Sequence, residues 1–109
     1  MITIGSFTKN GNQFSGVIET LSILQEIWLL PTQPSDEIAP HYLAHFADRP
    51  AVIGKGWNKR ADDGTDYVHL VINEPAMMAP LNCRLIKSET GYDLLWDERR
   101  PVQMTVFWQ

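Results

Sequence analysis

Hydrophobic and polar residues alternate over several short stretches of this chain, and turn-forming residues separate those stretches. Alternation with a period of two predicts β-strands. The first pair of strands is predicted over residues 3–18, with the reversal at Asn10-Gly11, a dipeptide that favours a two-residue hairpin turn. This turn would place Phe7 opposite Phe14, so we expect an aromatic cross-strand pair.

Two more hairpins are predicted later in the chain. One covers residues 52–73 and reverses at residues 62–65, with the sequence Asp-Asp-Gly-Thr. The other covers residues 81–96 and reverses at residues 88–91, with the sequence Ser-Glu-Thr-Gly. Both reversals contain the glycine and the short polar side chains that favour a turn.

Three segments leave alternatives open. Residues 21–30 carry apolar side chains at both helical and strand spacings, and we favour a strand buried on both faces. Residues 41–46 are predicted as a short strand or a helical turn. Residues 101–109 carry apolar and aromatic side chains, and a free tail would leave these side chains exposed to water. We expect this tail to form a final strand, docked on its own chain or exchanged with a second copy.

The strands follow one another through short turns, without the alternation of strand and helix that a parallel sheet needs. The pattern therefore predicts a mainly β fold, either a small antiparallel barrel or a highly curved sheet built from hairpins. A chain of 109 residues fits one β-rich domain over residues 1–109.

Composition narrows the function classes. The net charge is −4, so a nucleic-acid partner would need a local basic patch. No run is long and apolar enough to span a membrane, and residues 1–5 do not open a signal peptide. The single cysteine, Cys83, fits a reducing compartment. We therefore expect a cytoplasmic protein with no membrane partner.

The second hairpin carries the most suggestive chemistry. A turn of two or four residues would pair Trp57 with Leu70 on the core face. The opposite face would then carry an amide, a guanidinium, a phenol and an imidazole, from Asn58, Arg60, Tyr67 and His69. A cation and a ring on an exposed sheet suit the stacking of unpaired bases. In the structural alternative, Arg60 stacks on Tyr67 simply as a cross-strand pair.

No metal, cofactor or catalytic site is expected. In a strand, His41 and His45 would lie about 13 Å apart, too far to share one metal ion. Cys83 would face Trp96 in the third hairpin and is expected to be a small buried hydrophobe. Because no acid, base and nucleophile can be brought together, we expect a protein that is not an enzyme.

Four tryptophans are many for a chain of this length. Trp57 and Trp96 are predicted to belong to the core. Trp28, Phe107 and Trp108 are candidates for a subunit interface, where aromatic residues are enriched, and they favour a homodimer.

Six segments of the chain carry a family resemblance: residues 2–11 (ITIGSFTKNG), 53–60 (IGKGWNKR), 63–67 (DGTDY), 73–75 (NEP), 80–82 (PLN) and 91–96 (GYDLLW). Together they resemble the bacterial domain-of-unknown-function family 736. The resemblance implies a small, soluble proteobacterial protein, encoded near plasmid or integrated mobile-element genes. The family supplies no catalytic residues that could be carried over.

Two functions follow as expectations. The first is a non-enzymatic accessory protein of mobile DNA that binds single-stranded nucleic acid or a partner protein through the Asn58, Arg60, Tyr67 and His69 face. The alternative is an acidic interaction or inhibitor module that acts as a homodimer. Its carboxylates would come from Asp48, Asp62, Asp63, Asp66, Asp93 and Asp97.

Overall fold

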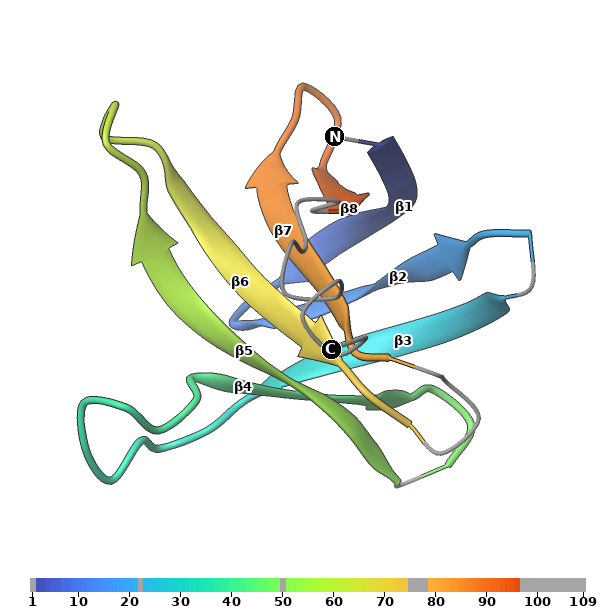
Figure 1. Ribbon diagram of the computed structural model, residues 1–109, viewed down its shortest axis with the longest axis horizontal. Helices are drawn as coiled ribbons and strands as arrows, with labels where there is room; N and C mark the ends of the chain where they lie inside the picture. The colour runs from blue at the N-terminus through green and yellow to red at the C-terminus, as the bar shows by residue number, and fades with distance from the viewer. Residues whose placement is uncertain (1, 22, 50, 75–78, 97–109) are drawn as a thin grey trace, which may run out of the picture.

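The computed structural model describes residues 2–21, 23–49, 51–74 and 79–96. Within them it shows eight antiparallel strands that close into a barrel (Figure 1). The strands are β1 (Ile2–Asn10), β2 (Gln13–Glu19), β3 (Leu24–Pro31), β4 (Tyr42–Phe46), β5 (Val52–Arg60), β6 (Asp66–Ile72), β7 (Leu81–Lys87) and β8 (Tyr92–Trp96). The predicted mainly β fold is confirmed, and of the two predicted forms it is the closed barrel.

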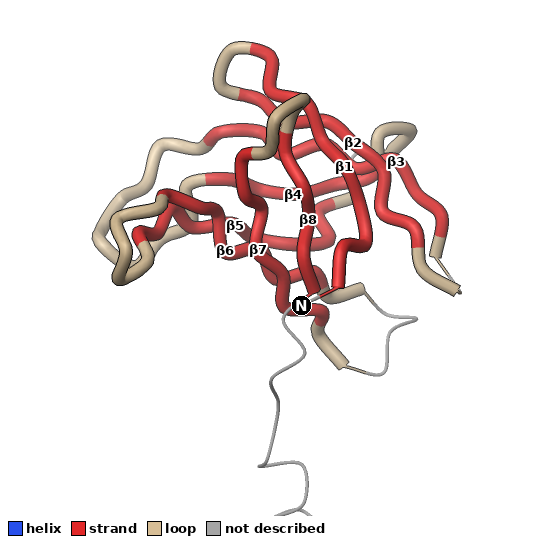
Figure 2. The backbone as a smooth tube through the Cα atoms, turned by 90° about the horizontal axis from the view of Figure 1, so that it is seen from above, coloured by secondary structure: helices blue, strands red, loops and turns tan. Residues whose placement is uncertain are grey.

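Each strand pairs with the next one along the chain, and β1 also pairs with β8. The tube view in Figure 2 shows this up-and-down order. Closure gives each of the eight described strands two neighbours, so the barrel that they form has no open sheet edge for pairing with another chain. Among the described residues, no helix is long and apolar enough to cross a membrane.

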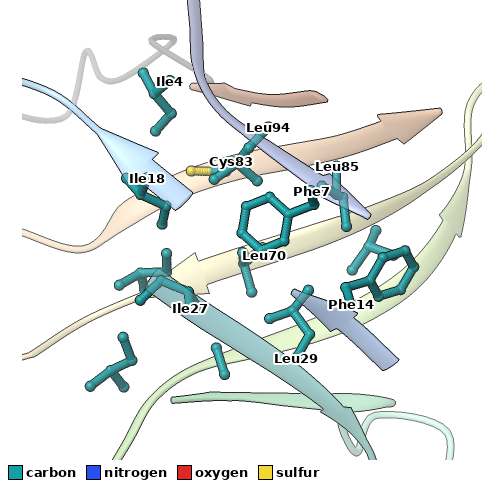
Figure 3. Packing of buried hydrophobic residues seen from close by; sticks show 14 residues of the cluster. Ile4, Phe7, Phe14, Ile18, Ile27, Leu29, Leu70, Cys83, Leu85 and Leu94 are labelled. Atoms are coloured by element: carbon teal, nitrogen blue, oxygen red, sulfur yellow. The ribbon is translucent and has the colours of Figure 1, made fainter. Parts of the chain in front are cut away.

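Apolar side chains from all eight strands fill the barrel (Figure 3). The buried hydrophobic residues are Ile4, Phe7, Phe14, Ile18, Ile27, Leu29, Ala44, Ile53, Val68, Leu70, Ile72, Cys83, Leu85 and Leu94. None of the buried side chains described is polar or charged. Eight strands enclose a space that side chains alone can fill. A ligand would therefore bind on the outside of the barrel or at one end.

The first hairpin turns one residue later than predicted. Asn10 pairs with Gln13, so the loop is Gly11-Asn12, and Phe7 lies opposite Gly16. Gly11 has a φ of 66°, which suits the first central position of a type II′ turn. The predicted Phe7–Phe14 cross-strand pair is therefore wrong. The pairing moves by two residues, which leaves both phenylalanines facing inward.

The second hairpin has a three-residue loop, residues 62–64, where an even number was predicted. The Ala61 N–H donates to the Thr65 carbonyl over 2.8 Å, and the Gly64 N–H donates to the Ala61 carbonyl over 2.9 Å. Gly64 has a φ of 89°, as the last residue of such a loop requires. An odd loop moves the pairing by one residue, and Trp57 faces His69 instead of Leu70.

A slip of one residue turns one strand over relative to the other. Trp57 consequently lies on the outside of the barrel, half-buried, and its predicted place in the core is wrong. Its indole Nε1 donates to the Ile38 carbonyl over 3.0 Å, so the β3–β4 loop covers part of the ring.

The third hairpin follows its prediction. Cys83 pairs with Trp96 and is fully buried. Trp96 is partly buried and packs against the core cluster. Strand β3 confirms the strand predicted over residues 21–30, although its burial is one-sided: Ile27 points inward and Trp28 outward. The predicted terminal strand over residues 101–109, with Phe107 and Trp108, lies outside the described residues.

Candidate nucleic-acid-binding surface

The structure separates the four residues that were predicted to share one sheet face. Asn58 pairs with Val68, so Asn58 and Arg60 occupy inward-facing positions where β5 leaves the core. Tyr67 and His69 alternate with the buried positions of β6 and lie on the outside. The prediction of one shared face is wrong because it rested on an even-numbered turn. The proposed binding roles stay predictions.

The outer face of β5, β6 and β7 brings rings and cations together. We call it the basic aromatic face. Its nine outward positions are Lys55, Trp57, Lys59, Tyr67, His69, Val71, Asn82, Arg84 and Ile86. The three strands lie side by side (Figures 1 and 2), and Trp57, His69 and Arg84 are consecutive partners in one cross-strand row. All nine residues are half-buried or exposed.

The aromatic rings on this face lie close to other side chains of the same face and remain half-buried. The ring centroids of Trp57 and His69 are 6.1 Å apart at an interplanar angle of 49°. The Arg84 guanidinium carbon lies 4.9 Å from the centroid of the Tyr67 ring. A cation over a ring is an attractive arrangement that also holds both side chains in place. Arg84 thus occupies the stacking position that the structural alternative gave to Arg60.

The charge of the basic aromatic face is opposite to that of the whole chain. Its nine positions hold three cations, Lys55, Lys59 and Arg84, and no carboxylate. Carboxylates border it, with Asp93 opposite Ile86 on β8. This is a local basic patch on a chain of net charge −4. Sequence reasoning missed Arg84 because it reaches the face from the neighbouring hairpin, and only the β6–β7 pairing shows that proximity.

Arg60 pairs with a carboxylate at the end of the barrel. Its Nε donates to Asp66 Oδ1 over 2.8 Å, and its Nη2 lies 3.4 Å from Oδ2. This hydrogen-bonded ion pair raises the pKa of Arg60 and lowers the pKa of Asp66. In the adjacent turn, the Thr65 N–H donates to the Asp63 carboxylate over 2.9 Å and lowers its pKa.

His41 and His45, which the sequence places too far apart to share a metal ion if they lie in a strand, each contact a backbone group. The Asn58 N–H donates to His41 Nδ1 over 3.1 Å, and His45 Nδ1 lies 2.9 Å from the Phe46 carbonyl. Nowhere in the described parts of the chain do three histidine, cysteine or carboxylate side chains gather as a metal would require. His45 also lies beside Trp28, with ring centroids 6.3 Å apart. Trp28 is 37% exposed, and its interface role stays a prediction.

The carboxylates proposed for the acidic alternative do not form one surface. Asp48 follows β4 at the end of the barrel where β5 begins, whereas Asp62 follows β5 at the other end. Asp66 is engaged with Arg60. Asp97 lies outside the described residues. The described members of this proposed set are therefore divided between the two ends of the barrel.

Comparison with known proteins identifies a family but no function. The family model described as "Protein of unknown function (DUF736)" matches residues 3–100 of the chain. The resemblance noted in the sequence is thereby confirmed. No curated protein and no solved structure gives a significant match to the chain.

Proposed function

The chain belongs to the DUF736 family, and we propose that it binds single-stranded nucleic acid on the basic aromatic face, as a non-enzymatic accessory protein. One observation carries the proposal: three rings and three cations lie together on three neighbouring strands of an exposed sheet face, with no carboxylate among its nine positions. Bases supply flat rings and phosphates supply negative charge, so both halves of each nucleotide find a matching group.

The arrangement favours a single strand over a duplex. Unpaired bases expose the ring faces that Trp57, Tyr67 and His69 could stack on, whereas a duplex buries those faces in its own stack. Base stacking on an aromatic side chain contributes about 1–3 kcal/mol per base and tolerates any sequence. Lys55, Lys59 and Arg84 would meet the phosphates between the bases. Because the face belongs to a closed barrel, it is rigid before the ligand arrives.

We expect a setting in mobile DNA, as the resemblance stated from the sequence implied, and the transfer and replication of mobile DNA pass through single strands. An accessory role there fits a protein that coats or delivers a strand without acting on it. No feature of the described residues gives comparable support to the acidic homodimeric alternative. If polynucleotides fail to bind, a protein partner on the same face is the alternative that remains to be tested.

The double variant Tyr67→Ala with Arg84→Ala tests this proposal. We expect it to lose affinity for a labelled oligonucleotide of about 16 nucleotides, measured by fluorescence anisotropy at about 50 mM salt. The expected loss is at least about tenfold, since stacking on one ring alone contributes about 1–3 kcal/mol.

Arg49→Ala is the matched control. Arg49 also lies over a ring, 4.5 Å from the centroid of Phe46, but away from the basic aromatic face. We expect the control to bind like the wild type. The proposal is refuted if the wild-type protein does not bind the oligonucleotide at this salt concentration, or if the control loses as much affinity as the double variant.

A further inference from the structure

The barrel also has a concave surface, at the end where β1, β5 and β7 finish. A groove of about 760 Å³ opens there, and we call it the mouth. It is lined by Lys9, Phe14, Tyr42, Asn58, Lys59, Arg60, Thr65, Asp66, Tyr67, Val68, Leu85, Lys87 and Tyr92. Most of these residues continue the inward-facing rows of their strands past the end of the core.

The floor of the mouth is apolar and aromatic. The Phe14 ring lies edge-on to Tyr42 at 5.5 Å and 70°, and to Tyr92 at 5.0 Å and 84°, between centroids. The buried side chains of Val68 and Leu85 complete this floor. Edge-to-face packing fixes the three rings in place. A flat apolar group entering the mouth would therefore meet a preformed surface.

The rim of the mouth is basic. Four of the chain's nine lysines and arginines line it, namely Lys9, Lys59, Arg60 and Lys87, with one carboxylate, Asp66. The cations reach the rim from three different strands, β1, β5 and β7. Asp66 holds Arg60 in place through two contacts. Lys9 Nζ lies 5.6 Å from the centroid of Phe14, so a positive charge stands directly beside the aromatic floor.

We propose that the mouth binds one nucleoside phosphate, with the base over the rings of the floor and the phosphate at Lys9, Arg60 and Lys87. The groove falls within the size range of pockets that bind small ligands, about 300–1,000 Å³. The nucleotide has two sources, a free mononucleotide or the end of a bound strand. The second source rests on the proposed function, because Lys59 and Tyr67 belong to both the mouth and the basic aromatic face.

The two sources are separated by ligand shape. The full chain is titrated with a linear 5′-phosphorylated oligonucleotide, the same oligonucleotide carrying a 3′-phosphate, a closed circle of the same sequence, and adenosine monophosphate. A strand end in the mouth makes one of the linear ligands bind about tenfold tighter than the circle, as one charge-assisted contact allows. A free nucleotide in the mouth shows as saturable binding of adenosine monophosphate.

Lys9→Ala with Lys87→Ala is the variant that tests the site, and Lys55→Ala is its control. Lys9 and Lys87 are exposed, so their loss should leave the core intact. We expect the double variant to lose the preference for strand ends or the binding of adenosine monophosphate, while its binding of the circle stays close to that of the wild type. Lys55 lies on the basic aromatic face outside the mouth, and its loss should weaken all strands equally.

Two outcomes overturn the inference. In the first, the circle binds as tightly as both linear ligands and adenosine monophosphate does not bind, which leaves the proposed function standing. In the second, Lys55→Ala removes the end preference as fully as the double variant does. Binding of adenosine monophosphate without binding of any strand would support the mouth and refute the proposed function.

Discussion

At the scale of single residues, the Arg60–Asp66 ion pair affects the charge of the mouth more than the stability of the fold. Both side chains of the Arg60–Asp66 pair are well exposed, at 70% and 72%. Exposed ion pairs contribute little to stability. The pair matters more for charge, because Asp66 neutralises one of the four cations that line the mouth.

Replacing the Asp66 carboxylate should raise the affinity for nucleotides, whereas the alanine variants should lower it. We expect Asp66→Asn to strengthen nucleotide and oligonucleotide binding by about two- to tenfold, because Arg60 loses an internal competitor for phosphate. A loss of affinity in this variant, with an unchanged thermal midpoint, would show that Asp66 positions the ligand instead of competing with it. The measurement is the same anisotropy titration.

The pH dependence of this effect follows from the lowered pKa of Asp66. Its pKa in the folded protein lies below the ordinary value of 3.8, so the carboxylate stays ionised at and above neutral pH. The stability that the pair contributes is present above pH 3.8 and is lost as the pH falls through the folded-state pKa. For an oligonucleotide without a terminal phosphate, whose phosphodiesters do not titrate in this range, wild type and Asp66→Asn should therefore differ in affinity equally at pH 6 and pH 8.

At the scale of strands and hairpins, the sequence sufficed for the elements but not for every pairing. Alternation and turn residues predicted all three hairpins, and the Cys83–Trp96 pairing was correct because the third turn spans residues 88–91, as predicted. The face assignment failed at β5 and β6 because Asp-Asp-Gly-Thr is compatible with loops of three or four residues. Whether the loop is odd or even decides which side of the sheet Trp57 faces, and local sequence does not settle that. The Arg84–Tyr67 stack joins two hairpins, so turn chemistry alone could not predict it.

The close approach of β5 and β6 depends on a glycine. A Cβ added at Gly54 would lie 2.6 Å from the Val71 carbonyl oxygen, which cannot move without disturbing the sheet. We expect Gly54→Ala to cost about 1–3 kcal/mol of unfolding free energy, as other overpacking changes do. Gly56→Ala is the control, since its Cβ would meet a side-chain methyl of Val68 at 3.1 Å, a milder clash than 2.6 Å against a backbone oxygen. Urea unfolding measures both, and equal costs would contradict this view of the barrel.

At the scale of the whole molecule, most of the residues that fill the barrel interior differ from those that form the candidate binding surfaces. Its apolar residues are used to fill the interior, as Leu29, Leu70 and Leu94 show with 0% exposure. Six cations and several of the rings outside the core lie on one outer face and at one end, on a chain whose net charge is −4. Binding variants on the basic aromatic face should therefore leave the fold unchanged, which makes their loss of affinity interpretable.

The salt dependence of oligonucleotide binding tests nucleic-acid binding by the basic aromatic face most directly. If Lys55, Lys59 and Arg84 each meet one phosphate, the logarithm of the affinity should fall with the logarithm of salt concentration at a slope of about −2. Arg84→Ala should reduce that slope by about 0.7, and Arg49→Ala should leave it unchanged. Absence of binding at about 50 mM salt, or a slope that Arg84→Ala does not alter, would contradict binding by this face.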